Sequence, residues 1–191
     1  MAYFYAAPGS RIEPGIPDLS TRKVYPKPPI KREPGVIEGE DLKVKTKTAG
    51  DVPNQDMTPF GDAWSGASQL WWVGGAPRER LDLELPFQKA GTYAISAAFT
   101  KAGDYGTVQL SLDHKPLGDP IDLYAPFPSV LHTGPILLGN MMLDEGHPTL
   151  SITVTGKNPK SSNYLVGMDW IKLTPAPTGS FPGRNEGGNR R

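Results

Sequence analysis

Residues 91–118 read GTYAISAAFTKAGDYGTVQLSLDHKPLG and carry the clearest structural signal in the chain. Apolar side chains recur at every second position, first at Tyr93, Ile95, Ala97 and Phe99, and then at Val108, Leu110 and Leu112. Successive side chains of a strand point to opposite faces, so this pattern predicts two strands that each bury one face. The turn-forming residues 101–104 lie between them and predict a hairpin. Residues 113–116 predict a second turn.

Similar short patterns occur along the chain and predict the fold class. Alternation recurs over residues 81–87 and 150–155, and further strands are predicted at 36–44, 69–73, 134–139 and 164–173. Residues 45–68 predict a long loop, and 119–128 an irregular segment. No segment has a sustained helical period. Eight or nine short strands separated by turn residues favour an all-β antiparallel sandwich, most simply a jelly roll.

The two ends of the chain differ in composition from the middle. Residues 1–35 contain seven of the 21 prolines, and residues 175–191 read PAPTGSFPGRNEGGNRR. Because proline fixes φ and removes a backbone donor, we expect an extended arm at 1–35. A sandwich domain at 36–174 and a Pro-, Gly- and Arg-rich arm at 175–191 complete the predicted organisation.

Composition and motifs narrow the function. Twenty basic residues balance 20 acidic ones, which gives no indication of nucleic-acid binding, and no apolar run approaches the roughly 20 residues of a membrane span. The chain has no cysteine. Its start lacks the basic segment of a secretory signal, so we expect either a cytoplasmic protein or the loss of an export signal.

Catalytic patterns are not found. Ser65 and Ser68 do not lie in a nucleophile elbow, and the pair Gly74–Gly75 lacks the spacing of a phosphate loop. The histidines are scattered over predicted turns, at His114, His132 and His147. We therefore predict that the chain is not an enzyme.

Short motifs at both ends of the predicted domain resemble one family of binding modules. Ile37–Glu40 and Gly167–Leu173 resemble the first and last strands of carbohydrate-binding modules of families 6 and 35, and residues 90–93, 110–113 and 143–147 are similar too. The resemblance covers roughly residues 36–174. It implies a galactose-binding-like jelly roll of a kind often appended to glycoside hydrolases or large secreted proteins. It also implies a periplasmic or extracellular location.

In that family, acidic residues of the terminal strands hold a structural calcium ion, and the matching positions are Glu38, Glu40 and Asp169. Calcium takes six to eight hard oxygen ligands. Glu38 and Glu40 would project to the same face of one strand. If the terminal strands pair, Asp169 approaches them. The alternative is that all three are ordinary carboxylates at a sheet edge.

The resemblance also implies a sugar site built from an aromatic platform and polar side chains, because sugar rings stack on aromatic faces. The predicted ligand-binding residues are Trp64, Trp72, Tyr105, Tyr124, Asn158 and Tyr164. Further polar candidates are Asp104, Asp122 and Asn163. A tryptophan in a sandwich is more often part of the core than of a binding site. Trp71 and Trp72 are adjacent and should point to opposite faces of the strand, so only one of them is expected to be buried.

Two functions stay open at this point. One is a non-catalytic module that binds a glycan or a protein. The other is a structural accessory subunit whose arms wrap neighbouring subunits, with Tyr3, Phe4 and Tyr5 as the anchor, since aromatic residues dominate interface hot spots.

Overall fold

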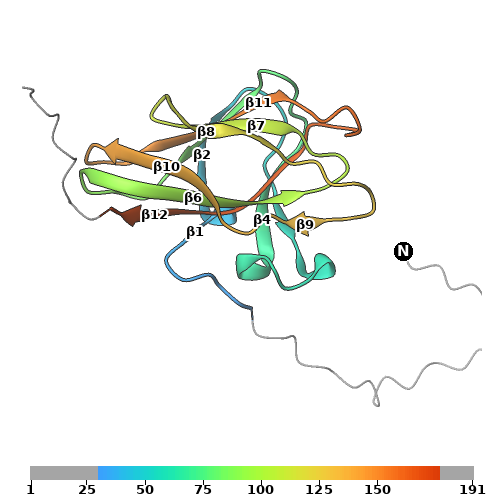
Figure 1. The fold of residues 1–191 in the computed structure, drawn as a ribbon, viewed down its shortest axis with the longest axis horizontal. Helices are drawn as coiled ribbons and strands as arrows, with labels where there is room; N and C mark the ends of the chain where they lie inside the picture. Colours follow the sequence, from blue (N-terminus) through green and yellow to red (C-terminus); the bar gives the residue numbers. More distant parts are fainter. Residues whose placement is uncertain (1–29, 177–191) are drawn as a thin grey trace, which may run out of the picture.

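A computed structural model describes residues 30–176 of the 191. They form two antiparallel sheets packed face to face (Figure 1). The path of the first sheet is β10 (Ile136–Leu143), β6 (Gly91–Lys101), β12 (Val166–Pro175), β4 (Ser68–Trp72) and β3 (Asn54–Asp56). The short strands β1 (Ile37–Glu38) and β9 (Leu131–His132) pair with β12 and β6. The second sheet is β2 (Lys43–Lys47), β5 (Arg80–Glu84), β11 (Thr149–Gly156), β7 (Thr107–Leu112) and β8 (Lys115–Asp122). The predicted antiparallel sandwich is confirmed.

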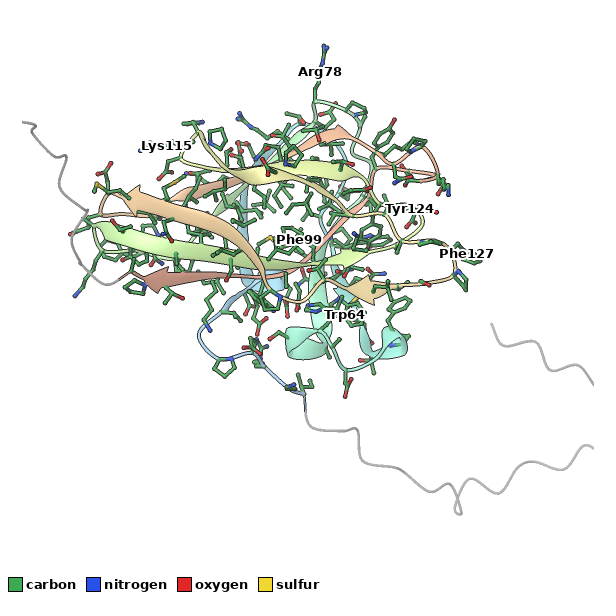
Figure 2. All side chains as sticks on the ribbon, in the orientation of Figure 1. Trp64, Arg78, Phe99, Lys115, Tyr124 and Phe127 are labelled. Carbon is green, nitrogen blue, oxygen red and sulfur yellow. The ribbon has the colours of Figure 1, made fainter. Side chains whose placement is uncertain are left out.

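The predicted hairpin between residues 91–101 and 107–112 is wrong. Both strands form as expected, but β6 lies in the first sheet and β7 in the second. The buried face of β6 and that of β7 meet across the same core (Figure 2, where Phe99 is labelled). Alternation therefore identified which faces are buried, and residues 102–106 cross between the sheets.

The true hairpin is β7–β8. Asp113 and His114 both have positive φ, at 46° and 66°, which suits the two-residue turns that join twisted strands. Strand β8 was missed because it contains Pro116, Gly118 and Pro120, which normally interrupt a strand. It lies at the edge of its sheet, where proline is tolerated because no partner needs its backbone donor.

The region predicted as a long loop, residues 45–68, contains part of β2, all of β3 and two short 3₁₀ helices, η3 (Thr58–Phe60) and η4 (Ser65–Ala67). A third 3₁₀ helix, η2 (Gly39–Asp41), follows β1 directly. The pairing of β1 with β12 confirms that the first and last strands of the domain meet. Residues 30–176 contain no helix long and apolar enough to cross a membrane.

Candidate functional site

Three carboxylates gather where the chain enters and leaves the sandwich. Glu38 ends β1, Glu40 lies in η2, and Asp169 lies in β12. The prediction that Glu38 and Glu40 share one strand face is wrong, because the strand ends at Glu38 and a 3₁₀ turn follows. Gly39 allows this turn to lie directly against β12, because an added Cβ would overlap the Met168 carbonyl oxygen. We call Glu38, Glu40 and Asp169 the carboxylate cluster.

A β-bulge aims Asp169 into the cluster. Met168 pairs with Phe99 and Trp170 pairs with Ala98, so Asp169 is an extra residue in β12. Met168 and Ile171 both belong to the core between the sheets. The two residues between them are therefore turned together to the outer side, as bulges commonly re-aim side chains. The Asp169 side chain is fully buried there, under η4.

One oxygen of Asp169 is held from two sides. The Ser65 backbone amide donates to Asp169 Oδ2 at 3.2 Å, and His132 Nε2 lies 2.8 Å from the same oxygen. The Gly134 amide donates to His132 Nδ1, so the ring carries its proton on Nε2 and donates it to Asp169. These contacts fix the rotamer of the carboxylate.

Glu38 is bound in the same one-sided way. The Ser65 hydroxyl donates to Glu38 Oε1 at 2.7 Å, and the Arg32 guanidinium donates to it at 3.1 Å. Its other oxygen has no hydrogen-bond partner, and neither do Asp169 Oδ1 and Glu40 Oε2, although all three atoms are buried. Unpaired buried carboxylate oxygens are costly, and a bound ion or an ordered water is how such atoms usually obtain a partner.

The pKa of Glu40 is consistent with several carboxylates lying close together. Burial is the largest cause that raises the pKa of Glu40, to about 7, and the negative charges of Glu38, Asp41 and Asp169 add to it. A backbone hydrogen bond acts in the opposite direction. A divalent cation would relieve both the repulsion and the lack of partners.

The donor chemistry of the cluster fits calcium, which prefers carboxylate and carbonyl oxygens. The three carboxylates nevertheless do not form a complete metal-coordination site. Within residues 30–176, no three acidic, histidine or cysteine side chains already surround a point where a metal ion would sit.

A second feature is a groove of about 490 Å³ at the end of the sandwich, formed by the β6–β7 crossing and the loops at 125–130 and 158–162. Two phenylalanines flank it: Phe127 is 89% exposed and Phe60 is 43% exposed (Figure 2 labels Phe127). Asp104 and Lys160 are its charged lining residues. The Ser162 amide donates to the Gly103 carbonyl and ties two of the walls together.

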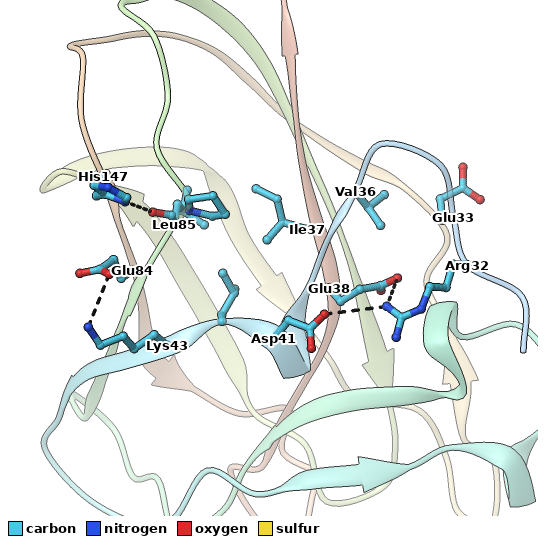
Figure 3. A pocket seen from close by; sticks show the side chains of 12 residues that line it. Arg32, Glu33, Val36, Ile37, Glu38, Asp41, Lys43, Glu84, Leu85 and His147 are labelled. Carbon is cyan, nitrogen blue, oxygen red and sulfur yellow. Dashed lines mark hydrogen bonds and ion pairs between the residues drawn. The ribbon is translucent and has the colours of Figure 1, made fainter.

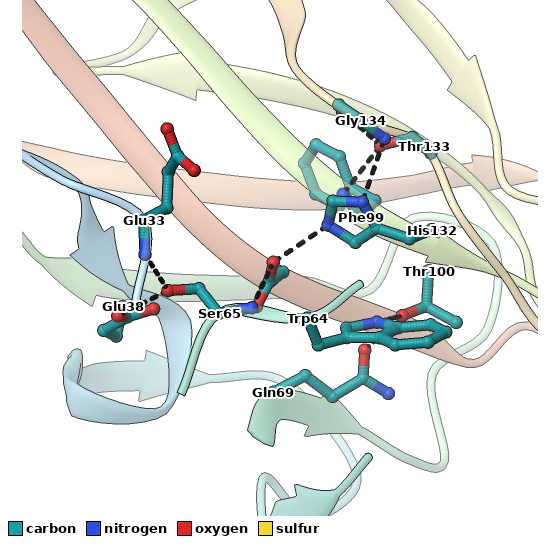
Figure 4. Close-up of polar contacts among 11 residues, drawn as sticks. Glu33, Glu38, Trp64, Ser65, Gln69, Phe99, Thr100, His132, Thr133 and Gly134 are labelled. Atoms are coloured by element: carbon teal, nitrogen blue, oxygen red, sulfur yellow. Dashed lines mark hydrogen bonds and ion pairs between the residues drawn. The ribbon is translucent and has the colours of Figure 1, made fainter. Parts of the chain in front are cut away.

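Three of the predicted sugar-binding aromatics are buried. Trp72 is fully buried and donates to the Ala49 carbonyl, whereas Trp71 is only partly buried, as alternation predicted. Trp64 is 3% exposed and its indole donates to the Thr100 hydroxyl (Figure 4). Tyr105 is 4% exposed, and its hydroxyl accepts from Gln69. Burial leaves these three rings without an open face for a sugar to stack on.

The other three predicted residues are only partly buried, and none of them lines the groove. The Asn158 side chain donates to Asp122, whose other oxygen accepts from the Tyr124 amide. The Lys157 ammonium lies 4.6 Å from the centre of the Tyr164 ring and covers one face. Of the further polar candidates, Asp104 alone lines the groove.

Sequence reasoning missed Phe60, Phe127, Ser65 and His132. Phe127 lies between two prolines, a pattern that indicates a rigid exposed loop. No local signal connects Ser65 or His132 with Asp169, since they meet only in the fold. Tyr3, Phe4 and Tyr5 lie outside the described residues.

The outer face of the second sheet is polar, and its centre is occupied by internal contacts. Asp82 accepts from Ser151 at 2.6 Å, from Thr46 at 2.8 Å and from Arg80 at 2.9 Å, which links β5 to β11 and β2. Burial acts to raise the pKa of Asp82, but these hydrogen bonds and the Arg80 charge outweigh it and lower the pKa below its ordinary value.

This lowered pKa predicts a pH dependence of stability. A carboxyl group with a lower pKa in the folded state stabilises the fold above its unfolded pKa, near 4, and loses that contribution as the pH falls through the folded pKa. Between pH 5 and pH 2, the free energy of unfolding should fall less in Asp82→Asn than in the wild type, as measured by urea titration. The exposed Asp119→Asn is the control and should follow the wild type. Equal losses in all three proteins would contradict the prediction.

No protein-family model matches this sequence, and no curated protein matches it. Solved structures do. The chain is similar to part of a Paenibacillus xanthan lyase, with 22% identity and a TM-score of 0.64 over 78% of this chain and 14% of that chain. The chain thus corresponds to a small part of that enzyme, and the likeness shows the fold.

Isolated modules are also among the similar structures. A family 35 carbohydrate-binding module from an environmental isolate is 13% identical, with a TM-score of 0.47 over 74% of this chain and 96% of that chain. The C-terminal family 6 module of a laminarinase from Zobellia galactanivorans is 13% identical, with a TM-score of 0.43 over 73% of this chain and 97% of that chain.

Proposed function

We propose that this chain is a non-catalytic carbohydrate-binding module whose glycan site is the groove between Phe60 and Phe127. The observation that carries the proposal is a concave surface that combines two exposed phenylalanine rings with the charged residues Asp104 and Lys160, because ligand sites join an apolar surface to a few polar groups. The Phe127 ring would stack on the apolar face of a sugar. Asp104 and Lys160 would hydrogen-bond its hydroxyl groups.

The groove is a better candidate than the outer face of the second sheet. The outward residues of β5, β7 and β11 alternate with core leucines, valines and isoleucines and include no aromatic residue. Their central carboxylate, Asp82, already accepts three hydrogen bonds. We infer an extracytoplasmic location, since the polysaccharides that such a module would bind lie outside the cell.

Phe127→Ala should weaken binding to any polysaccharide that the wild type retains by about tenfold, or about 1.4 kcal/mol, because a stacking platform is lost. The measurement is affinity gel electrophoresis with xylan, mannan, galactan, laminarin and xanthan. Phe87→Ala is a matched control, since Phe87 is 51% exposed but lies against His147, away from the groove. Retention of none of these polysaccharides by the wild type would count against glycan binding, and equal weakening by both variants would count against this site.

We further propose that calcium binds at the carboxylate cluster and has a structural role. Its support is the set of unpaired oxygens on Glu38, Glu40 and Asp169. An ion held there would join the first and last strands of the domain to η2. The negative charge that attracts it would come from the three carboxylates of the cluster.

Removal of calcium by excess chelator should therefore lower the melting temperature. A ligand present at 100 times its dissociation constant stabilises the folded state by about 2.7 kcal/mol. This corresponds to a shift of roughly 5 to 10 °C for a domain of this size. Differential scanning fluorimetry in calcium and in chelator, with magnesium as the comparison ion, measures it. Identical melting curves in calcium and chelator would reject the site.

A further inference from the structure

Residues 31–35 lie across the carboxylate cluster although they belong to the segment predicted as an extended arm. We call residues 31–35 the strap. Three hydrogen bonds hold its backbone. The Gly66 amide donates to the Lys31 carbonyl at 2.9 Å, and the Glu33 amide donates to the Ser65 hydroxyl oxygen at 2.8 Å. The Lys172 ammonium donates to the Pro34 carbonyl at 2.8 Å. Ser65 is also the residue that binds Glu38 and Asp169, so the strap and the cluster share a contact.

Arg32 is the point where the strap touches the cluster itself. Its guanidinium lies 3.1 Å from Glu38 Oε1 and 3.8 Å from Asp41 Oδ2 (Figure 3). A Cβ added to Gly66 would lie 3.7 Å from the Arg32 guanidinium and 2.6 Å from Glu40 Oε1, so both side chains border the same space beside Gly66. Within the described part of the chain, it is the one lysine or arginine that forms an ion pair with the cluster.

The environments of the two partners differ. The Glu38 side chain is 7% exposed, whereas the Arg32 side chain is 58% exposed. Arg32 can therefore leave for water at small cost, while Glu38 cannot. An exposed cation paired with a buried carboxylate is a replaceable counterion.

The ion pair between Arg32 and Glu38 also explains why the carboxylate cluster is not arranged around a metal ion. Arg32 and Ser65 together hold Glu38 through Oε1, and Oε2 stays unpaired. A metal ion that drew on Glu38 would bring two positive charges close to the guanidinium. Repulsion between them opposes simultaneous binding.

We propose that Arg32 is a resident counterion that competes with calcium for Glu38, so that calcium binding releases the strap. The inference rests on the proposed calcium site. Coupling between two binding events is reciprocal: calcium weakens docking of the strap by the factor by which the docked strap weakens calcium binding.

Isothermal titration of the full chain with calcium chloride tests the competition. Arg32→Gln removes the charge and should tighten calcium binding by roughly three- to tenfold. Lys31→Gln is the matched control, since it removes the same charge one residue earlier, from a side chain that makes no ion pair with the cluster. The control should bind calcium within about twofold of the wild type, because exposed charges beyond contact distance are screened.

Release of the strap has its own measurement. The chain has no cysteine, so Ile30→Cys gives a single site for a nitroxide label just before the strap, at a residue that is 65% exposed. Calcium should increase the mobility of the label in the electron paramagnetic resonance spectrum. In the Arg32→Gln background calcium should change the mobility of the label little, because the charge that calcium repels is absent and the three backbone hydrogen bonds of the strap remain.

The outcomes separate the two proposals. If wild type and Arg32→Gln bind calcium equally, or if Arg32→Gln binds it more weakly, the competition is overturned while the calcium site stands. Equal tightening by Arg32→Gln and Lys31→Gln, or a label that calcium does not mobilise, overturns it too. If neither wild type nor Arg32→Gln binds calcium, both proposals fail.

Discussion

Alanine at position 39 is expected to destabilise the domain by about 3 kcal/mol and to abolish the proposed calcium binding. The added Cβ would lie 2.3 Å from the Met168 carbonyl oxygen and 3.0 Å from that of Asp169. Both are backbone atoms of β12, so no side-chain rotation relieves the overlap. The backbone of η2 must move away from β12 instead, which separates Glu38 and Glu40 from Asp169. Forced overlap in a packed interior costs about 1–3 kcal/mol or more.

Urea unfolding of Gly39→Ala in chelator and in calcium chloride measures both effects. Gly156→Ala is the control, because no atom lies within 4 Å of the Cβ it would gain and its φ is not positive. It should match the wild type within about 0.5 kcal/mol. If Gly39→Ala were as stable as Gly156→Ala, the close approach of η2 and β12 would be wrong.

The sequence predicted strands and buried faces better than it predicted partners. Alternation over 91–101 and 107–112 depends on which side chains avoid water, and that is the same for a hairpin and for two strands in facing sheets. The short connection at 102–106 favoured the hairpin, but Leu123 and Leu165 bond its backbone from other parts of the chain. Such long-range contacts leave no local trace, so the crossing between sheets was not predictable.

The carboxylate cluster shows a similar limit. The acidic residues at positions 38, 40 and 169 were found from their motifs, and the pairing of the terminal strands brings them together. Their partners were not found, since Ser65, His132 and Arg32 come from three separate segments of the chain, η4, β9 and the strap. The bulge at Asp169 was also invisible, because the sequence Gly167–Leu173 reads as an uninterrupted strand.

Aromatic residues were the least predictable part of the proposed glycan site. Trp64 follows polar and glycine residues, which favoured an exposed loop, yet its indole packs edge-on to His132 and is buried. Phe127 has an equally irregular surrounding sequence but is exposed. Composition does not distinguish a loop that folds back over a sheet from one that projects into water.

Asp169→Asn is expected to remove the stabilising effect of calcium without weakening the metal-free domain. Asparagine retains one side-chain oxygen, which can still accept from the Ser65 amide and His132 Nε2. It removes a negative charge that repels Glu40, from a buried side chain whose Oδ1 has no partner. The metal-free variant should therefore be at least as stable as the metal-free wild type, because an unpaired buried charge is costly.

The expected difference appears only on addition of calcium. At 1,000 times the dissociation constant, the wild type should gain about 4 kcal/mol, and the variant should gain almost nothing because a charged ligand is missing. Chemical unfolding of both proteins, each in chelator and in calcium, gives the four free energies of unfolding that the comparison requires. Asp113→Asn is the matched control, since its side-chain oxygen accepts from the Thr149 amide far from the cluster, and it should keep the full calcium effect. A variant that is strongly destabilised in chelator would instead show that Asp169 has a structural role in which the metal has no part.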